Sequence, residues 1–433
     1  MNKPLTIGIY VIRFPTASET FIVTKVLGLL EAGFDVRIFT QEPSQQWIRF
    51  AILQDRPDIR RRVFTAPPSR VVLKVLARGT YELVKTAVRH PVAFGRFVLH
   101  NWRHRHELPF GFLKGVYTRL HFVSHRLDVL HVEFDTQALE VADLKEYLHC
   151  KLLFSARGAF QATSVLDKFP NALVHLHKYV DGYHFISQYL RENMRRLGLP
   201  SSVRTWLIEP AIDLRLFKPV EPRSLRSAGA PLRVISVGRL TWQKGYEFAV
   251  DAVARVHAAG VPVEYRILGE GEYDDPAMYA AWQWGLTQQG VVTFVGAVRR
   301  EEIPHYLADS DVMLHASLSE GLCNAVIEAQ AMGVPVVASD AGGLPENIQD
   351  GVTGFVVPRR NPEALAEKLM VLAHDPELCL RMGQAGRARA AARFNLTDQV
   401  QNFISLYHEL CGDTRPDELP NMVEKGKAVE RAN

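Results

Sequence analysis

The chain has 433 residues, of which 47% are hydrophobic and 23% charged, and its formal net charge is +4. This composition is typical of a soluble globular protein and excludes a disordered or fibrous chain, and the length predicts two or three domains. No apolar run approaches the ~18 residues that cross a bilayer, and the first residues enter a strand pattern without a signal peptide. Four widely spaced cysteines indicate a reducing compartment, so we expect a cytoplasmic protein.

Positive charge is concentrated in one segment. Residues 49–126 contain 16 Lys and Arg against four Asp and Glu, so the rest of the chain is net negative. This asymmetry indicates a polyanionic surface as partner: anionic lipid, nucleic acid or an acidic glycan. A solvated helical insert is the alternative interpretation of the segment.

The amino-terminal elements follow a βαβ pattern. Residues 5–12 predict a buried strand, and an amphipathic helix and a second strand over 35–40 follow it. Thr16 and Glu19 have the spacing of a capping box, which predicts that the helix begins near Ala17.

Strand and helix alternate as far as residue 213, which predicts one doubly wound α/β domain, placed over residues 1–217. The basic segment 49–126 lies within it and is mostly helical in pattern. The later strands of this domain are expected at residues 129–134, 151–155, 183–186 and 205–208.

Residues 218–232 are rich in Pro, Gly and Ser and predict a linker. The α/β pattern then restarts and predicts a second Rossmann-like domain over 233–396, a closing helix over 397–412 and a polar tail over 413–433. Two such domains would face each other across a cleft, with ligands at the carboxyl ends of the strands.

The first strand of the second domain ends in a glycine followed by two cations. Gly238 allows a sharp turn, after which Arg239 and Lys244 project at the carboxyl edge of the sheet. Two cations at that edge can bind a diphosphate. The alternative is a solvated basic pair.

A second motif combines a glycine loop with two carboxylates. Glu320 and Gly321 precede a helix that we expect to begin near Leu322 and Cys323. The free backbone amides at the start of a helix form an anion site. Glu328 lies about two turns, ~10 Å, along the same helix. One carboxylate can reach the phosphate and sugar of an elongated ligand, and the other can reach its ribose. A solvated Glu328 is disfavoured because most sides of the helix are apolar.

These motifs together resemble the family-four retaining glycosyltransferases, which have the GT-B fold. The resemblance covers residues 233–392 and is carried by Gly238-Arg239-x4-Lys244-Gly245, by Glu320-x7-Glu328, and by Ala338-Ser339-Asp340-Ala341-Gly342-Gly343-Leu344-Pro345-Glu346 running to Asp350-Gly351-x2-Gly354. It implies that the second domain binds a nucleotide-sugar. It implies that Arg239 and Lys244 bind the diphosphate and that Glu328 binds the ribose. It also implies that Glu320 lies against the sugar and that the amides after Gly321 bind phosphate.

The first half resembles the members of this family that build bacterial exopolysaccharide, including colanic-acid-type enzymes. Arg13-Phe14-Pro15-x2-Ser18-Glu19-Thr20-Phe21-Ile22, Phe185-Ile186-Ser187-x2-Leu190 and Pro210-Ala211-Ile212-Asp213-x3-Phe217 carry this resemblance. It implies Ser18 and Glu19 as sugar or acceptor contacts and a lipid-linked or polysaccharide acceptor.

One position departs from the family pattern. Many members carry His-Gly after the strand that corresponds to residues 151–155, where this chain has Ala156-Arg157-Gly158. Arg157 either binds donor phosphate or an acidic acceptor, or forms a structural ion pair.

We expect neither a metal nor a cofactor. The resemblance implies that cationic stabilisation of the leaving diphosphate replaces a metal. Asp309 and Asp311 form an Asp-x-Asp, but they flank a buried strand, where aspartates are common caps. His100 and His104 have i, i+4 spacing on a helix, yet arginines surround them and no third ligand is evident, so we expect a solvated basic face.

The leading hypothesis is therefore a metal-independent retaining glycosyltransferase with a glycan acceptor and no nucleic-acid partner. Residues 49–126 would rest on the inner face of the cytoplasmic membrane. A GT-B sugar-nucleotide epimerase or phosphorylase, and an inactive glycan- or nucleotide-binding scaffold, are the alternatives.

Overall fold

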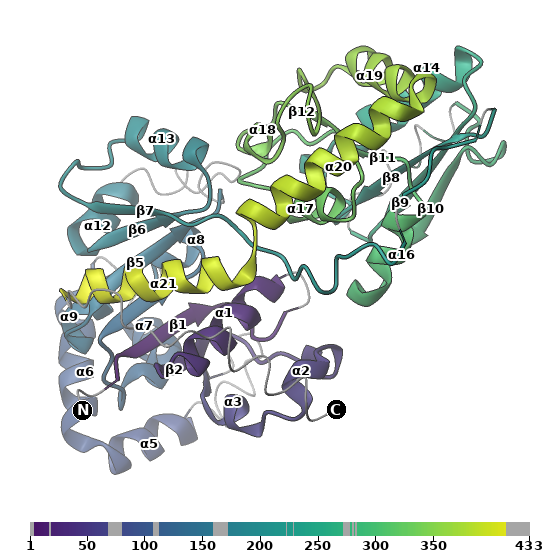
Figure 1. The fold of residues 1–433 in the computed structure, drawn as a ribbon. Coiled ribbons are helices and arrows are strands. Elements are labelled where there is room, and N and C mark those ends of the chain that lie inside the picture. Colours follow the sequence, from purple (N-terminus) through teal and green to yellow (C-terminus); the bar gives the residue numbers. More distant parts are fainter. Residues whose placement is uncertain are drawn as a thin grey trace.

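The structure, a computed structural model, contains two α/β lobes built around two separate sheets (Figure 1). The N-terminal lobe comprises the first sheet with its helices, and the C-terminal lobe comprises the second. The described residues are 4–16, 19–67, 80–106, 112–158, 172–221, 223–227, 229–271, 278, 281 and 284–412.

The sheet of the N-terminal lobe has seven parallel strands in the order β3-β2-β1-β4-β5-β6-β7. Its central strands are buried along almost their whole length because helices cover both faces, as in other parallel sheets. The strands are β1 (Thr6–Val11), β2 (Asp35–Thr40), β3 (Val63–Thr65), β4 (Val129–Val132), β5 (Lys151–Ala156), β6 (Gly182–Phe185) and β7 (Arg204–Leu207). The short β3 lies inside the basic segment, whose pattern was mostly helical and indicated no strand.

The first helix, α1 (Thr20–Glu31), begins later than the capping-box spacing predicts. Glu19 is its N-cap residue and its side chain makes no capping hydrogen bond, while the Thr16 hydroxyl donates to the carbonyl of Arg13 at 3.2 Å. The capping-box prediction was therefore wrong, because the Thr16 side chain bonds back into the preceding turn. Residues 17–18, which include the predicted start, lie outside the described residues.

The remaining helices of this lobe are short, apart from two in the basic segment. Residues 68–79 of that segment lie outside the described residues. The helices are α2 (Ala51–Gln54), α3 (Pro57–Arg61), α5 (Thr80–Arg89), α6 (Pro91–Arg103), α7 (Phe112–Thr118), α8 (Asp135–Ala138), α9 (Leu144–Leu148), α12 (Ala172–Tyr179) and α13 (Gln188–Arg196). None of the helices in the described part of the chain is long and apolar enough to cross a membrane.

The sheet of the C-terminal lobe has six parallel strands in the order β10-β9-β8-β11-β12-β13. These are β8 (Leu232–Val237), β9 (Val263–Leu268), β10 (Val292–Gly296), β11 (Val312–His315), β12 (Val336–Ser339) and β13 (Gly354–Val357). Their helices are α14 (Tyr246–Ala258), α16 (Ile303–Ala308), α17 (Asn324–Ala331), α18 (Leu344–Asn347), α19 (Pro362–His374) and α20 (Pro376–Arg393). Each sheet therefore has the strand order of a dinucleotide-binding domain. The first three strands are added towards one edge of the sheet, and the following strands are added on the other side of the first strand.

The last helix returns the chain to the N-terminal lobe. In Figure 1, α20 runs along the C-terminal lobe and α21 (Leu396–Cys411) continues along the N-terminal lobe. There α21 contacts α1, and Val400, Phe403 and Tyr407 belong to the same core cluster as the side chains of α1 and β1. The final helix thus ties the two lobes together.

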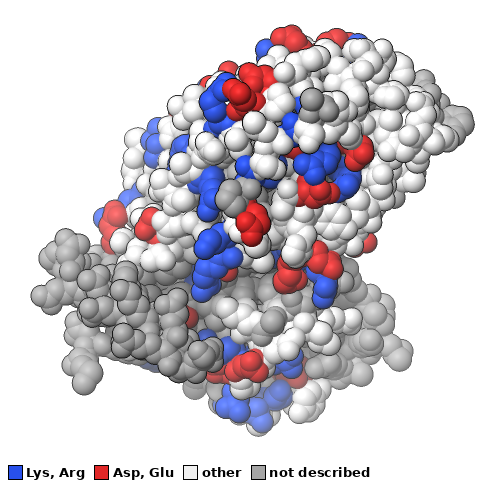
Figure 2. Space-filling view, turned by 45° about the vertical axis from the view of Figure 1, so that its right-hand side comes forward, with Lys and Arg blue, Asp and Glu red and all other residues white. Residues whose placement is uncertain are grey.

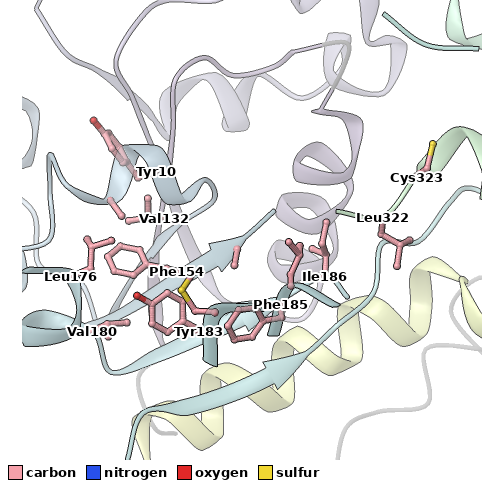
Figure 3. Close-up of a cluster of buried hydrophobic side chains, with 14 of the residues drawn as sticks. Tyr10, Val132, Phe154, Leu176, Val180, Tyr183, Phe185, Ile186, Leu322 and Cys323 are labelled. Atoms are coloured by element: carbon pink, nitrogen blue, oxygen red, sulfur yellow. The ribbon is translucent and has the colours of Figure 1, made fainter. Parts of the chain in front are cut away.

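A second buried cluster crosses from one lobe to the other. It includes Phe154 and Phe185 of the first sheet and Leu322 and Cys323 from the loop before α17 of the C-terminal lobe. Figure 3 shows that Ile186 and Leu322 lie beside each other at the junction. Hydrophobic packing therefore holds the carboxyl ends of the two sheets against each other.

Candidate active site

The residues singled out in the second half lie at the switch point of the second sheet. Strands β8 and β11 are neighbours in this sheet. The loop after β8 carries Arg239 and Lys244, and the loop after β11 carries Glu320. In open α/β sheets, ligands bind in the crevice at this point, where successive connections leave in opposite directions. The fold therefore brings together side chains that are about 80 residues apart in sequence.

Glu320 is the centre of a polar cluster. Its Oε1 atom accepts from the Lys244 Nζ at 2.6 Å and from the Ser317 Oγ at 2.7 Å, and lies 3.0 Å from the His315 Nε2. The Cys323 Sγ lies 3.3 Å from the same histidine nitrogen. Sequence reasoning missed His315 and Ser317, although a polar residue at the end of an apolar strand was a signal.

The charges of this cluster stabilise one another. Burial alone would raise the pKa of Glu320, but the Lys244 ammonium and the His315 ring outweigh it and hold that pKa well below its usual range. Burial would lower the pKa of Lys244, but Glu320 raises it. Burial would also lower the pKa of His315, but Cys323 and Glu320 raise it to about 9. The site therefore holds a carboxylate beside two cations at neutral pH.

Glycines allow close approach of the backbone at two points. Gly245 has φ +58°, and a Cβ there would lie 2.3 Å from the carbonyl oxygen of Ala316, so only glycine lets the Lys244 loop lie against the end of β11. A Cβ on Gly321 would lie 2.7 Å from the carbonyl oxygen of Arg157, in the other lobe. The glycine loop after Glu320 is thus part of the contact between the lobes.

The helix that follows begins at Asn324, two residues later than expected, with Cys323 as its N-cap. The amide of Cys323 donates to the Asn347 Oδ1 at 2.9 Å, so a protein side chain already occupies one of the amides that the sequence suggested for phosphate. Leu322 and Cys323 are buried because they pack into the junction between the lobes.

Glu328 lies on α17 and is buried. Its Oε1 lies 3.2 Å from the Arg300 guanidinium, and Arg300 also donates to the Thr20 Oγ1, in the other lobe, at 2.6 Å. Burial raises the pKa of Glu328 to about 7, although Arg300 opposes the shift. Arg300 was missed from the sequence, because nothing in its local pattern shows that it reaches a helix 28 residues away.

Arg157 forms an ion pair inside the N-terminal lobe. Its guanidinium contacts the carboxylate of Glu133 at 2.9 Å and the Glu133 carbonyl at 3.1 Å, and it stacks on Phe21 with 4.0 Å to the ring centroid. Glu133 is fully buried and is also paired with Lys25 of α1. Of the two interpretations left open for Arg157, the contacts favour a structural ion pair.

Glu19 also lies at the junction of the lobes. Burial raises its pKa to about 6, while Arg157, Arg239 and Arg13 oppose the shift, so arginines of both lobes surround this carboxyl. Arg239 itself is exposed. It is close enough to Lys244 for its positive charge to lower the pKa of that ammonium. Ser18, the other predicted contact of the first lobe, lies outside the described residues.

The motifs that resembled metal sites are engaged in other contacts. Asp309 and Asp311 form ion pairs with Arg233 at 2.6 and 2.9 Å. The expectation of a solvated histidine face was wrong: His100 is buried and lies 3.0 Å from Asp143. His104 lies 3.1 Å from Glu146, which completes a His-His-Glu group that the sequence spacing did not reveal.

Residues 217–389 match the family model of Glycosyl transferases group 1. This part of the chain is similar to the group 1 glycosyltransferases. The matched range includes every residue of the Glu320 cluster and Glu328.

Curated relatives are similar to this chain over most of its length. The chain is 25% identical to WcaL of Escherichia coli, named for colanic acid biosynthesis, over 84% of this chain and 90% of the relative. It is 26% identical to the amylovoran biosynthesis glycosyltransferase AmsK of Erwinia amylovora over 89% of this chain and 95% of that protein. A GDP-mannose-dependent phosphatidylinositol monomannoside mannosyltransferase of Mycobacterium tuberculosis is 28% identical over 56% of this chain and 66% of its own length.

Solved structures show the same fold. HepE of Anabaena in complex with UDP superposes with a TM-score of 0.67 at 18% identity, covering 94% of this chain and all of that chain. A sucrose-phosphate synthase of Thermosynechococcus elongatus superposes with a TM-score of 0.69 at 19% identity, covering 95% and 100%. The chain thus has the GT-B fold that the sequence resemblance implied.

Proposed function

We propose that the chain transfers a sugar from a nucleotide-sugar to a lipid-linked glycan, with retention of configuration and without a metal, in the biosynthesis of a bacterial exopolysaccharide. The observation that carries the proposal is the Glu320–Lys244 pair at the switch point of the second sheet, 2.6 Å apart and beside the loop that contacts the first lobe. The names of WcaL and AmsK support the biosynthetic setting.

In this proposal the donor lies along the carboxyl edge of the second sheet. Lys244 and Arg239 stabilise the negative charge that develops on the leaving diphosphate, which is the task that a metal performs elsewhere. Glu320 stays ionised because its neighbours are cationic, so it can stabilise positive charge at the sugar. Glu328 would bind the ribose hydroxyls. The acceptor attacks from the side of the N-terminal lobe, on the face from which the nucleotide departs.

The basic segment gives the proposed enzyme a surface for the membrane. The helix α5 has no buried residue, and Tyr81, Val84 and Val88, on one face at i, i+3 and i+7, are 62, 58 and 75% exposed. Val92, at the start of α6, is 72% exposed. An amphipathic helix with an uncovered apolar face and flanking cations is suited to the interface of an anionic bilayer. We call this surface the α5 face.

The charge of the C-terminal lobe is arranged differently. On the face in Figure 2, blue and red side chains are interspersed over the upper part of the molecule. Part of the excess charge of the basic segment is also internal, because Arg119 is buried and pairs with Asp143 at 2.6 Å. The helices α5 and α6 would therefore provide the contact with the membrane. The protein would act as a peripheral membrane protein on the cytoplasmic side.

The proposal is tested by a thermal-shift screen against UDP-, GDP- and ADP-sugars, followed by transfer assays with the sugar that raises the Tm. The acceptors would be a lipid-linked oligosaccharide and the same oligosaccharide without lipid, and the anomeric configuration of the product would be read by NMR. We expect one nucleotide to stabilise the protein, transfer to the lipid-linked acceptor in the presence of EDTA, and a product with the configuration of the donor. An inverted product, or loss of transfer on chelation, would refute the mechanism. Donor binding without transfer would indicate a scaffold.

A further inference from the structure

The Glu320 cluster contains three atoms that transition metals bind. His315 ends β11, Cys323 caps α17, and Glu320 lies in the loop between them. The His315 Nε2 lies 3.0 Å from the Glu320 Oε1 and 3.3 Å from the Cys323 Sγ, and the three ligand atoms all lie within 4.8 Å of one another. One strand, loop and helix therefore place an imidazole, a carboxylate and a thiol around a single point.

These separations are close to the edges of a zinc coordination tetrahedron. With Zn–N and Zn–O of about 2.1 Å and Zn–S of about 2.3 Å, neighbouring ligands lie about 3.4 Å apart for N and O and about 3.6 Å apart for N and S. The observed separations of 3.0 and 3.3 Å need to widen by only about 0.3 to 0.4 Å. The Ser317 Oγ, 2.7 Å from the same carboxylate oxygen, or a water would complete the coordination.

The composition of the cluster favours some metals over others. Once His315 and Cys323 release their protons to solvent, they offer the imidazole and the thiolate that select Zn²⁺ and other thiophilic ions, whereas Mg²⁺ and Mn²⁺ prefer carboxylates, carbonyls and water. All three side chains are largely buried, with exposed fractions of 4% for His315, 11% for Glu320 and 4% for Cys323. A bound ion would therefore be shielded from solvent and held by rigid elements.

An ion at this point would compete directly with Lys244. The Lys244 Nζ lies 2.6 Å from the Glu320 Oε1, the oxygen that would also bind the ion. Because an ammonium and a divalent cation repel each other at such a distance, Lys244 would be displaced from its partner. The negative charge of Glu320 would be neutralised in the same step.

We propose that His315, Glu320 and Cys323 form an inhibitory site for a thiophilic divalent cation such as Zn²⁺, which displaces Lys244 from Glu320 and so switches off sugar transfer. The inference rests on the proposed function of Glu320 and Lys244 in the donor site. It gives the enzyme a response to free zinc that is separate from catalysis, which we propose to be metal-independent.

Binding is tested with Co²⁺, which replaces zinc and gives a thiolate-to-metal charge-transfer absorption when it binds a cysteine. The metal-free full-length protein is titrated as wild type, as Cys323→Ala and as the control Cys379→Ala. Cys379 is a thiol of the same lobe whose Sγ lies 3.1 Å from a backbone carbonyl of Asp311. We expect the absorption at one cobalt per chain in the wild type and the control, and its loss in Cys323→Ala. Should Cys323→Ala not fold by circular dichroism, Cys323→Ser provides the same comparison with a closely matched shape.

Inhibition is measured on the same proteins, each relative to its own rate without metal. We expect Zn²⁺ to remove most of the transfer activity of the wild type and of Cys379→Ala, a reversal by EDTA, and little effect on Cys323→Ala. Mg²⁺ at the same concentration should have no effect. Equal zinc inhibition of Cys323→Ala, or an unchanged cobalt absorption in that variant, would overturn the inference.

The two measurements separate this inference from the proposed function. Transfer activity without the cobalt absorption would reject the ion site and leave the glycosyltransferase mechanism standing. The cobalt absorption in a protein that transfers no sugar would support the ion site and reject the assignment of Glu320 and Lys244 to the donor.

Discussion

At the scale of single residues, Glu320 and Lys244 are held in place before any donor binds. Three side chains contact one oxygen of Glu320, so the carboxylate has a fixed orientation and a lowered pKa. Preorganised charges of this kind contribute more to catalysis than flexible ones, because they need no rearrangement during the reaction.

We predict that Lys244→Ala and Glu320→Ala each reduce the transfer rate by at least about 10²-fold, the usual effect of removing one group that stabilises charge in the transition state. The fold should remain, because the loop and α17 are held by backbone contacts and apolar packing. Initial rates and the Tm of each variant check this. Lys368→Ala removes a surface lysine of the same lobe that pairs with Glu367 and lies over the Phe355 ring, and it is the matched control. Full activity in either site variant would refute the assignment.

A second prediction at this scale concerns Glu328 and pH. Its pKa is raised to about 7, so the side chain is about one-tenth ionised at pH 6 and about nine-tenths ionised at pH 8. The ribose hydroxyls would donate to the carboxylate, with Arg300 as the charge that faces it. The affinity for the nucleotide-sugar should therefore rise by up to about tenfold between these pH values.

The measurement for Glu328 is the Kd of the donor by calorimetry as a function of pH. Glu328→Gln keeps the size of the side chain but removes the titration, so its Kd should vary little over the same range. An affinity that falls with rising pH in the wild type would show that the protonated acid, not the carboxylate, binds the donor.

At the scale of secondary-structure elements, a buried charge network fastens α1 to the first sheet. Lys25 of α1 and Arg157 at the end of β5 both pair with Glu133 after β4. His131 of β4 lies 2.6 Å from the Tyr407 hydroxyl of α21. These contacts join three elements of the lobe to the last helix of the chain.

We predict that Arg157→Ala lowers the free energy of unfolding by about 2 kcal/mol, because it removes hydrogen bonds to a buried carboxylate. Denaturant titration measures this, with Arg215→Ala as the control, since Arg215 is 87% exposed and pairs with Asp213 on the surface. An Arg157→Ala protein of unchanged stability that has lost transfer activity would instead assign Arg157 to a substrate.

Much of this level of structure could be predicted from the sequence. The strands of both sheets contain many buried apolar residues, and β2, for example, has the bounds that the pattern predicted. The loops that carry Lys244 and Glu320 were found because they follow such strands. His315 and Arg300 were missed because their roles depend on tertiary contacts, and β3 was missed because three residues carry no periodicity. The start of α1 was misplaced because Thr16 had a competing hydrogen-bond partner.

At the scale of the whole molecule, the lobes meet through several kinds of contact. Glu346 of α18 accepts hydrogen bonds from the amides of Gln188 and Tyr189 of α13 at 2.8 and 2.6 Å, which satisfies free donors at the start of that helix. Apolar packing at Ile186 and Leu322 and the Arg300–Thr20 hydrogen bond also join the lobes. The junction on which the proposed site depends is therefore built from both polar and apolar contacts.

The α5 face leads to a prediction for the molecule as a whole. Vesicles containing anionic lipid should sediment the protein, and the bound fraction should fall as salt rises, because exposed charges are screened beyond about 10 Å at 0.1 M. Val88→Glu should reduce binding strongly, since it places a carboxylate in the exposed apolar row of α5. Val220→Glu introduces the same change at a valine that is 90% exposed but lies in the segment between the two sheets, so it should bind like the wild type. Equal binding of the two variants, or binding that does not respond to salt, would show that α5 does not rest on the membrane.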